Sequence, residues 1–572
     1  MSALPSTAES KIARRISGRS WLEPLLLGLV LALWFGYELG DRALWAPDEG
    51  RYAEIPREMV ETGDYLTPRL NGVKYFEKPP LVYWLQAGAI KTFGLGEWAL
   101  RLWPAGFGLL GCLAVYFIGR RLYGRRTGLF AAVILAISPL YDFMGAILTL
   151  DMPLTALLTV ALGAFLIGTR APPGMARRGW FYLFYLTSAL TVLTKGLVGI
   201  VIPGMVIGAW IAILGEWRLL RAMYLPTGLL LFLAVAGPWH YFVAQANPEF
   251  NQFYFVHEHL QRYLTKVHQR YEPMWFFIPV LFAGMYPWSA FLPHMLRDMS
   301  RGFWRERRQH REIWFLCLWA LLPFLFFSLS SSKLIPYILP ILPPLALLFG
   351  RWLARMLDQP KRFGHTEFVL LLLLGVFFTA AIVLAAIFLP NHPSVARATT
   401  QIGPGLFFMA ISMLLAGLLP FCANLWHNRY TTILALFAGA TLLIGTFDHY
   451  LSRVDAGRSV KDLAMDLRKV LAPGDEVMTY QAYYQDLPVY IRQRVTIVDW
   501  KGELEFGTTV EDTSAWMIDQ EMLRRRWLEP RTIYLLTDTS NYNNLLLVLP
   551  GSACLLRSTE RVVLINNRKC HS

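Results

Sequence analysis

Long apolar blocks alternate with polar stretches along most of the chain. A helix needs about 20 mostly apolar residues to cross a bilayer, and about 13 blocks have roughly this length. The blocks cover residues 21–39, 99–119, 127–145, 152–169, 180–194, 197–214, 222–244, 274–293, 313–330, 335–350, 367–389, 405–424 and 430–447. This pattern predicts a polytopic α-helical membrane protein.

Basic residues concentrate in alternate connections between the blocks. These connections are residues 120–126, 170–178, 218–221, 297–311 and 351–362 and Arg429, together with the N-terminal residues 11–15. By the positive-inside rule they lie in the cytoplasm, and the remaining connections face outward. An odd number of spans then places the last segment, from residue 448, outside as well.

The composition agrees with a membrane protein and argues against a soluble domain, a disulfide scaffold and a nucleic-acid-binding protein. Of the 572 residues, 55% are apolar and 16% are charged, whereas a soluble domain carries about 25% charged residues. Five cysteines are too few for a disulfide scaffold. The net charge of +14 is explained largely by topology, so nucleic-acid binding is not required.

Two outward segments are long enough to fold. We expect a transmembrane domain over residues 1–447, with an outward loop at about 40–98, and a soluble α/β domain over 448–572. Patterning in the second predicts helices at 460–471 and 513–527 and strands at 476–480, 495–498, 532–536 and 561–565. Cys554 and Cys570 lie in this domain, where an oxidising compartment would let them either pair or stay free.

The first outward loop opens with two adjacent acids. Asp48 and Glu49 follow the first apolar block, and carboxylates at the bilayer edge are costly unless a cation pairs with them or a function uses them. The stretch with Arg57, Glu58 and Glu61 is more typical of an amphipathic helix lying on the membrane surface.

Three lysines from distant parts of the sequence are predicted to reach the same outer face. Lys78 lies in the first outward loop, and Lys195 and Lys333 lie at the outer ends of apolar blocks. One lysine at such a position is usually an anchor whose ammonium reaches the interface. Three beside acidic residues favour phosphate binding instead, and Arg51 and Arg262 are weaker candidates of the same kind.

Two other outward residues allow more than one interpretation. Asp151 lies two residues before a proline, so it either caps a helix, belongs to a site, or does both. His257 begins a His-x-His pattern around Glu258 that could bind a divalent metal, with Glu77 or Asp48 as a partner, although such spacing has low specificity. No other cofactor is expected.

The outward loop contains four motifs of a known family. They are Asp-Glu at 48–49, Arg-Tyr-Ala-Glu at 51–54, Gly-Asp-x-x-x-Pro at 63–68 and Glu-Lys-Pro-Pro-x-x-Tyr-Trp at 77–84. The sequence resembles the GT-C glycosyltransferases related to protein O-mannosyltransferases, and is most similar to the 4-amino-4-deoxy-L-arabinose lipid A transferases. The resemblance covers residues 41–200 and continues at 331–340, whereas the C-terminal domain offers no matching motif.

This resemblance implies an enzyme of the bacterial inner membrane with its active site and C-terminal domain in the periplasm. It would move 4-amino-4-deoxy-L-arabinose from undecaprenyl phosphate to a lipid A phosphate and so give resistance to polymyxin and other cationic antimicrobial peptides. No nucleotide sugar would bind, because the activated sugar arrives on a lipid. One alternative is a related transferase that moves a neutral sugar from a polyprenyl phosphate to protein or polysaccharide. A membrane transporter is the alternative from a different class, but it would place ionisable residues near mid-span.

The resemblance also assigns Asp48 and Asp151 to the active site. An acceptor phosphate is mostly ionised at neutral pH and needs no general base, so we expect Asp48 to orient the acceptor or stabilise positive charge at the anomeric carbon. The donor's ammonium group needs a carboxylate, which Glu77 or Asp151 would provide. Tyrosines expected to hydrogen-bond the sugar or phosphate are Tyr52, Tyr75 and Tyr337.

Overall fold

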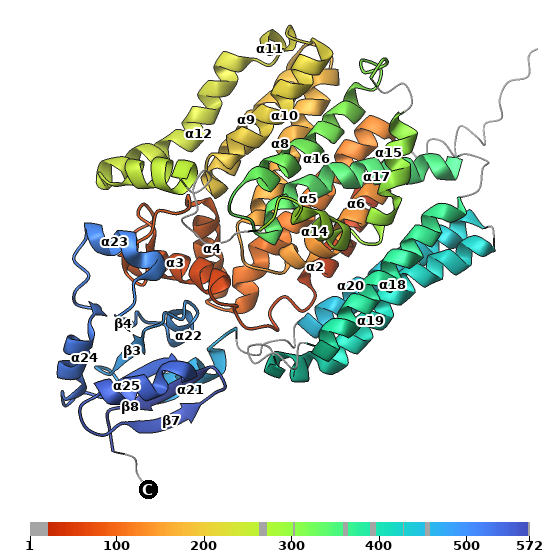
Figure 1. Cartoon of the computed structure of the whole chain (residues 1–572). Coiled ribbons are helices and arrows are strands. Elements are labelled where there is room, and N and C mark those ends of the chain that lie inside the picture. Colours follow the sequence, from red (N-terminus) through yellow and green to blue (C-terminus); the bar gives the residue numbers. More distant parts are fainter. Residues whose placement is uncertain are drawn as a thin grey trace, which may run out of the picture.

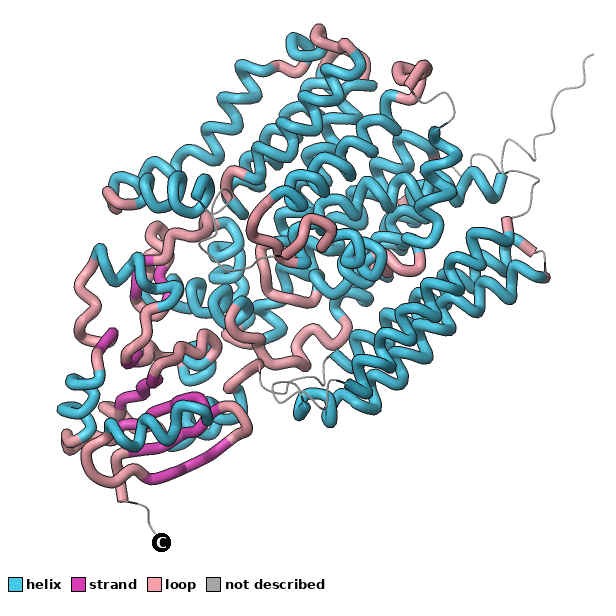
Figure 2. Tube along the Cα trace, viewed as in Figure 1, coloured by secondary structure: helices cyan, strands magenta, loops and turns pink. Residues whose placement is uncertain are grey.

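A bundle of long helices forms most of the molecule, and a domain built on a β-sheet lies at one end of it (Figure 1). The computed structural model describes residues 21–261, 272–300, 304–358, 364–388, 396–426, 428–451 and 458–569. Strands lie in the C-terminal domain and in the first outward loop (Figure 2). Two residues singled out from the sequence, Arg262 and Cys570, lie outside the described residues.

Eight helices in the described residues are long and apolar enough to cross a membrane. They are α5 (Glu97–Tyr123), α8 (Asp151–Arg170), α12 (Leu225–Ala246), α16 (Arg311–Leu329), α17 (Leu342–Asp358) with the preceding 3₁₀ helix η3 (Ile335–Ile341), α18 (His365–Phe388), α19 (Ala396–Leu425) and α20 (Arg429–Leu451). The number becomes nine if α6 (Arg125–Ala136) and α7 (Pro139–Gly145), which meet at 68°, form one bent span. The polytopic α-helical fold is confirmed, although this test gives fewer spans than the roughly 13 apolar blocks.

Several of the remaining apolar blocks form helices that are not both long enough and apolar enough to cross a membrane. α2 (Leu22–Gly36) and α10 (Val198–Leu214) are apolar but short. α9 (Met175–Lys195) begins with basic residues, and the four-residue α11 (Leu219–Ala222) leads into α12.

The sequence predicted one span at residues 274–293, but this prediction is wrong. The block is divided into α14 (Phe277–Gly284), the 3₁₀ turn η2 (Trp288–Phe291) and α15 (Leu292–Ser300). Pro287 lies at the break, and a proline supplies no N–H to continue a helix and restricts the residue before it. The hydroxyl of Ser289 donates to the carbonyl of Phe282 at 2.7 Å, which holds the turn closed.

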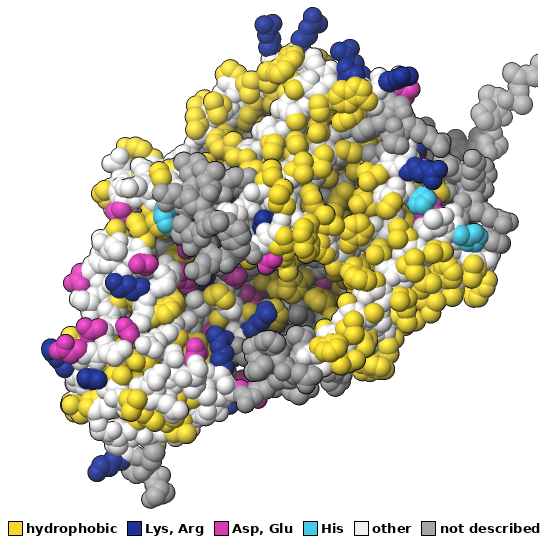
Figure 3. All heavy atoms as spheres, in the orientation of Figure 1, with side chains coloured by type: hydrophobic (Ala, Val, Ile, Leu, Met, Phe, Trp, Pro, Cys, Tyr) yellow, Lys and Arg dark blue, Asp and Glu magenta, His cyan; other side chains and the backbone are white. Residues whose placement is uncertain are grey.

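α18, α19 and α20 pack side by side along one flank of the bundle (Figure 1). Their outward surface is apolar, with Leu373, Phe377 and Leu384 all more than half exposed. Figure 3 shows this flank as a nearly continuous hydrophobic face. Exposure of so much apolar surface to water is unfavourable, so this face is suited to contact with lipid tails.

The first outward loop folds into α3 (Asp48–Thr62), a two-stranded hairpin of β1 (Arg69–Leu70) and β2 (Val73–Lys74), and α4 (Leu81–Phe93). The predicted amphipathic helix at the membrane surface is wrong for the middle of α3. Arg57 and Glu58 are buried, and the Glu58 carboxylate accepts the Gly72 N–H at 3.0 Å. Protein therefore covers this helix, so its charged residues are satisfied by internal partners.

The C-terminal domain has a six-stranded sheet in the order β5-β4-β3-β6-β8-β7. β3 (Glu476–Tyr480) is parallel to β4 (Thr496–Val498) and β6 (Ile533–Asp538), while β8 (Val562–Asn566) is antiparallel to β6 and to β7 (Cys554–Ser558). The remaining elements are α21 (Lys461–Val470), α22 (Leu487–Ile491), η5 (Gly502–Leu504), α23 (Glu505–Val510), β5 (Met517–Ile518), α24 (Gln520–Trp527), η6 (Thr539–Asn541) and α25 (Tyr542–Val548).

The four predicted strands and the first predicted helix of this domain match the structure, whereas the short helices α22, α23 and α25 and both edge strands were not predicted. A helix was predicted at 513–527, but only the second half of this range is helical, as α24. Met517 and Ile518 in the first half form the edge strand β5. β7, at the other edge, was not predicted, since four of its five residues are exposed. Cys554 at its start is disulfide-bonded, while Cys112, Cys317 and Cys422 are free.

A single hydrophobic core joins this domain to the first outward loop. Leu44 and Ile55 from the loop side belong to the same buried cluster as Leu487, Ile497 and Leu536 from the domain. Burial of apolar area contributes about 25 cal/mol per Å². The domain is therefore packed on the loop, which fixes the loop's polar side chains in place.

Candidate functional site

Helix α3 carries the adjacent acids at the end of the bundle that faces the sheet domain. Asp48 and Glu49 lie in its first turn, where unsatisfied N–H groups and the helix dipole stabilise negative charge. The Asp48 side chain is 56% exposed and its Oδ1 lies 3.6 Å from Nη1 of Arg51. Glu49 points into the protein and is buried.

Glu49 is held by two buried arginines. Its carboxylate accepts bonds from Arg42 at 2.7 and 3.1 Å and from Arg101 at 2.9 and 3.0 Å. Burial opposes ionisation of Glu49, but Arg101 and Arg42 outweigh it and lower its pKa to about 2. The same carboxylate accepts the Leu148 N–H at 3.0 Å. Leu148 lies in the turn before Asp151, so Glu49 ties the start of α3 to the start of α8.

Arg51 connects the first outward loop to the C-terminal domain. Its Nη2 lies 2.5 Å from Oε2 of Glu503, and its guanidinium lies 5.9 Å from the ring centroid of Tyr75. Oε1 of Glu503 accepts from Nε2 of Gln485 at 2.8 Å. Burial raises the pKa of Glu503, and Arg51 acts in the opposite direction. A charge pair whose side chains are only 11% and 14% exposed therefore crosses between the two parts of the molecule.

The phenol of Tyr52 lies among the acidic residues predicted for the site. Burial raises the pKa of Tyr52 well above its ordinary value; Arg51 opposes this effect, and Asp48, Glu77 and Asp151 raise the pKa further. All four charged groups therefore lie within electrostatic reach of one phenol. The structure brings the three predicted acids together although more than 100 positions separate Asp48 from Asp151.

Lys195 and Asp151 form an ion pair where α9 ends and α8 begins. Nζ of Lys195 lies 2.5 Å from Oδ1 of Asp151 and 5.1 Å from the ring centroid of Tyr337. Tyr337 belongs to η3, which packs against both α8 and α16. These three predicted residues thus lie side by side.

Lys78 and Tyr75 line the same region from the loop between β2 and α4. Nζ of Lys78 donates to the Glu77 carbonyl at 2.7 Å and lies 3.4 Å from Oε2 of Glu258. Glu258 is buried and belongs to the π-helix η1 (Gln252–Gln261). The Tyr75 hydroxyl is buried and has no hydrogen-bond partner in the described part of the chain, so it could bond to a substrate.

Lys333 has different surroundings from the other two lysines. It is buried, and its ammonium donates to the backbone carbonyls of Ser330 at 2.6 Å and Glu272 at 2.9 Å. Among the described residues, no carboxylate lies within ion-pair distance of it. It precedes Tyr337 by four positions, in the segment that leads into η3.

His257 gives little support to a metal site. Its Nδ1 lies 3.7 Å from Oε1 of Glu258, and its ring stacks on Phe253. Within the described ranges, no group of three or more His, Cys, Asp or Glu side chains is placed to hold a metal ion. The His259 side chain lies outside the described part of the chain, as does Arg262, which was predicted to bind phosphate.

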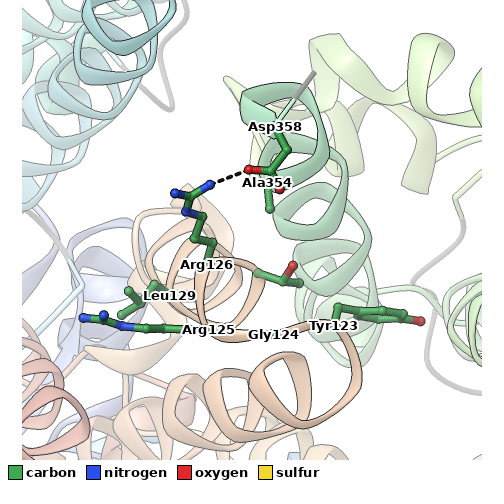
Figure 4. Close-up of a pocket in the computed structure, with 8 residues that line it drawn as sticks. Tyr123, Gly124, Arg125, Arg126, Leu129, Ala354 and Asp358 are labelled. Atoms are coloured by element: carbon green, nitrogen blue, oxygen red, sulfur yellow. Dashed lines mark hydrogen bonds and ion pairs between the residues drawn. The ribbon is translucent and has the colours of Figure 1, made fainter. Parts of the chain in front are cut away.

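A pocket of about 430 Å³ lies at the opposite end of α5 (Figure 4). Tyr123, Arg125, Arg126 and Asp358 line it, and Arg126 pairs with Asp358 there. Tyr123 and Arg101 lie on the same helix, and Arg101 contacts Glu49. At a rise of about 1.5 Å per residue, they are roughly 30 Å apart. In Figure 3, basic side chains lie at the top of the bundle, whereas both acidic and basic side chains lie on and beside the sheet domain. The pocket is therefore separate from the candidate site.

The sequence did not indicate the partners that orient the site. Arg42 lies at the start of the first outward loop and Arg101 just after its end. The cost of a buried carboxylate could have predicted cations of this kind near Glu49. Glu503 carried no signal, because its domain has no recognised motif and its contact with Arg51 depends on tertiary packing.

Comparisons with known proteins agree with this architecture. The profile of the family described as dolichyl-phosphate-mannose-protein mannosyltransferase matches residues 77–242, which include Glu77, Lys78, Asp151 and Lys195. The profile of the aminoarabinose transferase C-terminal domain matches residues 463–566.

Relatives match over nearly the whole length. The undecaprenyl phosphate-alpha-4-amino-4-deoxy-L-arabinose arabinosyl transferase of Edwardsiella ictaluri is 30% identical over 513 residues, covering 86% of this chain and 89% of the relative. The protein of the same name from Erwinia tasmaniensis is 30% identical over 519 residues, covering 88% and 90%. The crystal structure of ArnT from Cupriavidus metallidurans bound to undecaprenyl phosphate superposes with a TM-score of 0.82 at 30% identity, covering 96% of this chain and 98% of that one. The chain therefore belongs to the family of undecaprenyl phosphate–4-amino-4-deoxy-L-arabinose arabinosyl transferases.

Proposed function

We propose that this protein transfers 4-amino-4-deoxy-L-arabinose from undecaprenyl phosphate to a phosphate of lipid A. The observation that carries the proposal is the end-to-end relationship to arabinosyl transferases, over 86% of the chain for the Edwardsiella ictaluri relative. A crystal structure of similar fold holds undecaprenyl phosphate. The added amino sugar masks negative charge on lipid A and gives resistance to polymyxin and other cationic antimicrobial peptides.

The reaction exchanges one sugar–phosphate bond for another. The bond between the anomeric carbon and the undecaprenyl phosphate oxygen breaks, and a bond from that carbon to a lipid A phosphate oxygen forms. Both phosphates are ionised near neutral pH, so no proton has to move. The main requirement is fixed positive charge near the leaving phosphate, where negative charge develops.

Lysines and acids divide this work in the proposed mechanism. Lys78 and Lys195 hold the leaving phosphate, assisted by Arg51 and by the tyrosines of the site. Asp48, which is half exposed, orients the acceptor or stabilises the developing positive charge at the anomeric carbon. Glu77 or Asp151 binds the ammonium group of the sugar.

We further propose that the site and the C-terminal domain face the periplasm, with a transmembrane domain over residues 1–447 and a periplasmic domain over 448–572. The arginines around the distant pocket support this orientation, because basic ends of membrane helices stay in the cytoplasm. Labelling single cysteines placed at exposed Lys469 and at exposed Arg126 with a membrane-impermeant reagent tests it. Intact inner-membrane spheroplasts should react at position 469 and not at 126.

Mass spectrometry of lipid A tests the function directly. A strain that expresses the protein should gain a phosphate-linked mass equal to aminoarabinose, and a strain lacking the gene should not. Expressed protein with an unchanged lipid A profile would overturn the proposal, and a neutral sugar on protein or polysaccharide would identify the related transferase activity instead.

A further inference from the structure

The turn between α16 and η3 contains a buried ammonium group with one N–H for which the described residues supply no acceptor. Lys333 is 5% exposed, and two of its three ammonium N–H groups have acceptors, the carbonyls of Ser330 and Glu272. The described residues supply neither an acceptor for the third nor a carboxylate within 4.0 Å. A buried charge without a counter-charge is costly, so an anion bound here would stabilise it.

A second polar group in the same turn is also unsatisfied. Ser332 is 8% exposed, and its hydroxyl has no hydrogen-bond partner among the described residues. The hydroxyl of neighbouring Ser330 is used inside the turn, donating to the Ser332 carbonyl at 3.1 Å. An ammonium and a hydroxyl, both buried and both able to donate, match the oxygen acceptors of a phosphate.

The turn adjoins apolar side chains that face outward from the bundle. Leu329 before it is 64% exposed and Ile335 after it is 50% exposed. Trp275, three residues after Glu272, is 63% exposed. Tryptophan is enriched where membrane meets water, and the exposed leucine and isoleucine are suited to lipid. A phosphate that reaches Lys333 from this side would therefore be carried on a lipid.

Lys333 also has a structural role at the end of α16. α16 ends at Leu329, and a lysine beside the last carbonyls of a helix stabilises its C-terminus. That role accounts for the bond to Ser330. It leaves the third ammonium N–H and the Ser332 hydroxyl unexplained.

We propose that the turn Ser330–Lys333 binds the phosphate of the acceptor lipid, separately from the site of the donor. This proposal rests on the proposed function, in which two lipid phosphates must be bound together. The donor carries an ammonium group, and the carboxylates that suit it lie around Tyr52 and Lys195. The turn lacks such a carboxylate in the described structure, so it suits a phosphate without an adjacent ammonium group.

Steady-state kinetics of the full-length enzyme in mixed micelles can separate the two phosphates. The variants are Lys333→Met, Lys333→Arg and Ser332→Ala, with Lys91→Met, an exposed lysine on α4, as the matched control. Loss of a charge-assisted hydrogen bond should raise KM for bisphosphorylated lipid A about ten-fold or more in Lys333→Met. KM for the undecaprenyl-phosphate donor should stay within about two-fold, Lys333→Arg should recover part of the loss, and Lys91→Met should behave as wild type. A purely structural lysine would lower stability and leave the ratio of the two KM values unchanged, which overturns the proposal.

A binding measurement keeps this test independent of turnover. Wild-type protein should bind bisphosphorylated lipid A more tightly than enzymatically dephosphorylated lipid A, and Lys333→Met should lose that preference. If wild-type protein shows the preference but no aminoarabinose is transferred, the proposed function fails while the phosphate site stands. Inorganic phosphate at millimolar concentration should not compete; full competition would show a site for free phosphate and overturn the lipid assignment.

Discussion

Asp48 and Glu49 are neighbours in the chain but carry their charges in different surroundings. Two buried arginines fix Glu49 as a carboxylate, which leaves it no freedom to bind a substrate. Asp48 is half exposed, and Arg51 at 3.6 Å is too distant for a strong hydrogen bond. One acid of the pair therefore holds the backbone in place, and the other remains available for chemistry.

At the same scale, Glu77 is expected to recognise the ammonium group of the sugar. Glu77→Gln keeps the size of the side chain and removes its charge, so it should lower aminoarabinose transfer about ten-fold or more. Purified enzyme with defined donor and lipid A provides the measurement. Glu61→Gln, on an exposed carboxylate of the same loop, should have little effect. Undiminished turnover of Glu77→Gln would remove Glu77 from this role.

Asp486 makes the stability of the C-terminal domain depend on pH. Burial raises the pKa of Asp486 to about 6, although Ser459 and the Val460 N–H donate to it. The unfolded chain releases this proton near pH 3.9, so the folded state holds it more tightly between about pH 4 and 6. The contribution of Asp486 to the free energy of unfolding should be greatest below about pH 4. It should fall by about 3 kcal/mol toward pH 6 and then level off.

Asp486→Asn is the variant that isolates this effect. An asparagine cannot titrate. The difference in unfolding free energy between wild type and variant should therefore change between pH 4 and 6 and be constant above pH 7. Unfolding of the full-length protein followed by tryptophan fluorescence at fixed ionic strength measures it. A constant difference across the whole range would contradict the predicted ionisation.

At the scale of elements, α3 lies directly against α22 through a glycine. A Cβ added to Gly50 would lie 2.5 Å from the Asp486 nitrogen and 2.6 Å from the Gln485 carbonyl carbon. Gly50→Ala should therefore force α3 and the C-terminal domain apart and reduce transfer strongly. Gly88→Ala on α4 is the control, because no atom lies within 4 Å of its added Cβ. Equal activity of the two variants would show that close packing at Gly50 is not needed.

Sequence patterns predicted elements better than their contacts. The central strands of the sheet were found because β3, β4, β6 and β8 are buried runs of β-branched and apolar residues. The edge strands β5 and β7 are too short or too exposed to give that signal. The same limit applies in the membrane, where Pro287 divides a block that hydropathy alone joins. For the site, sequence patterns suggested which charged and aromatic residues come together, whereas the pairing of Arg51 with Glu503 depends on domain packing.

At the scale of the whole molecule, the sheet domain completes the polar site of the membrane domain. Glu503 neutralises Arg51 at 2.5 Å across the boundary, while Phe506 stacks on Phe253 with ring centroids 3.8 Å apart. Removing one partner of a buried ion pair leaves the other charge uncompensated. Glu503→Gln should therefore release Arg51 from its position beside Tyr75 and lower kcat about ten-fold.

The exposed neighbour Glu505 supplies the control for this variant. Glu505→Gln should keep wild-type activity, and Glu503→Asp should recover part of it, because a shorter carboxylate still carries the charge. If Glu503 acts on the site through Arg51, Arg51→Gln and the double variant Arg51→Gln/Glu503→Gln should have the same kcat. Additive losses would mean that Glu503 acts independently of Arg51, and a lower melting temperature with unchanged kcat would limit the domain to a structural role. The double-mutant cycle thus distinguishes a domain that positions catalytic machinery from one that only covers it.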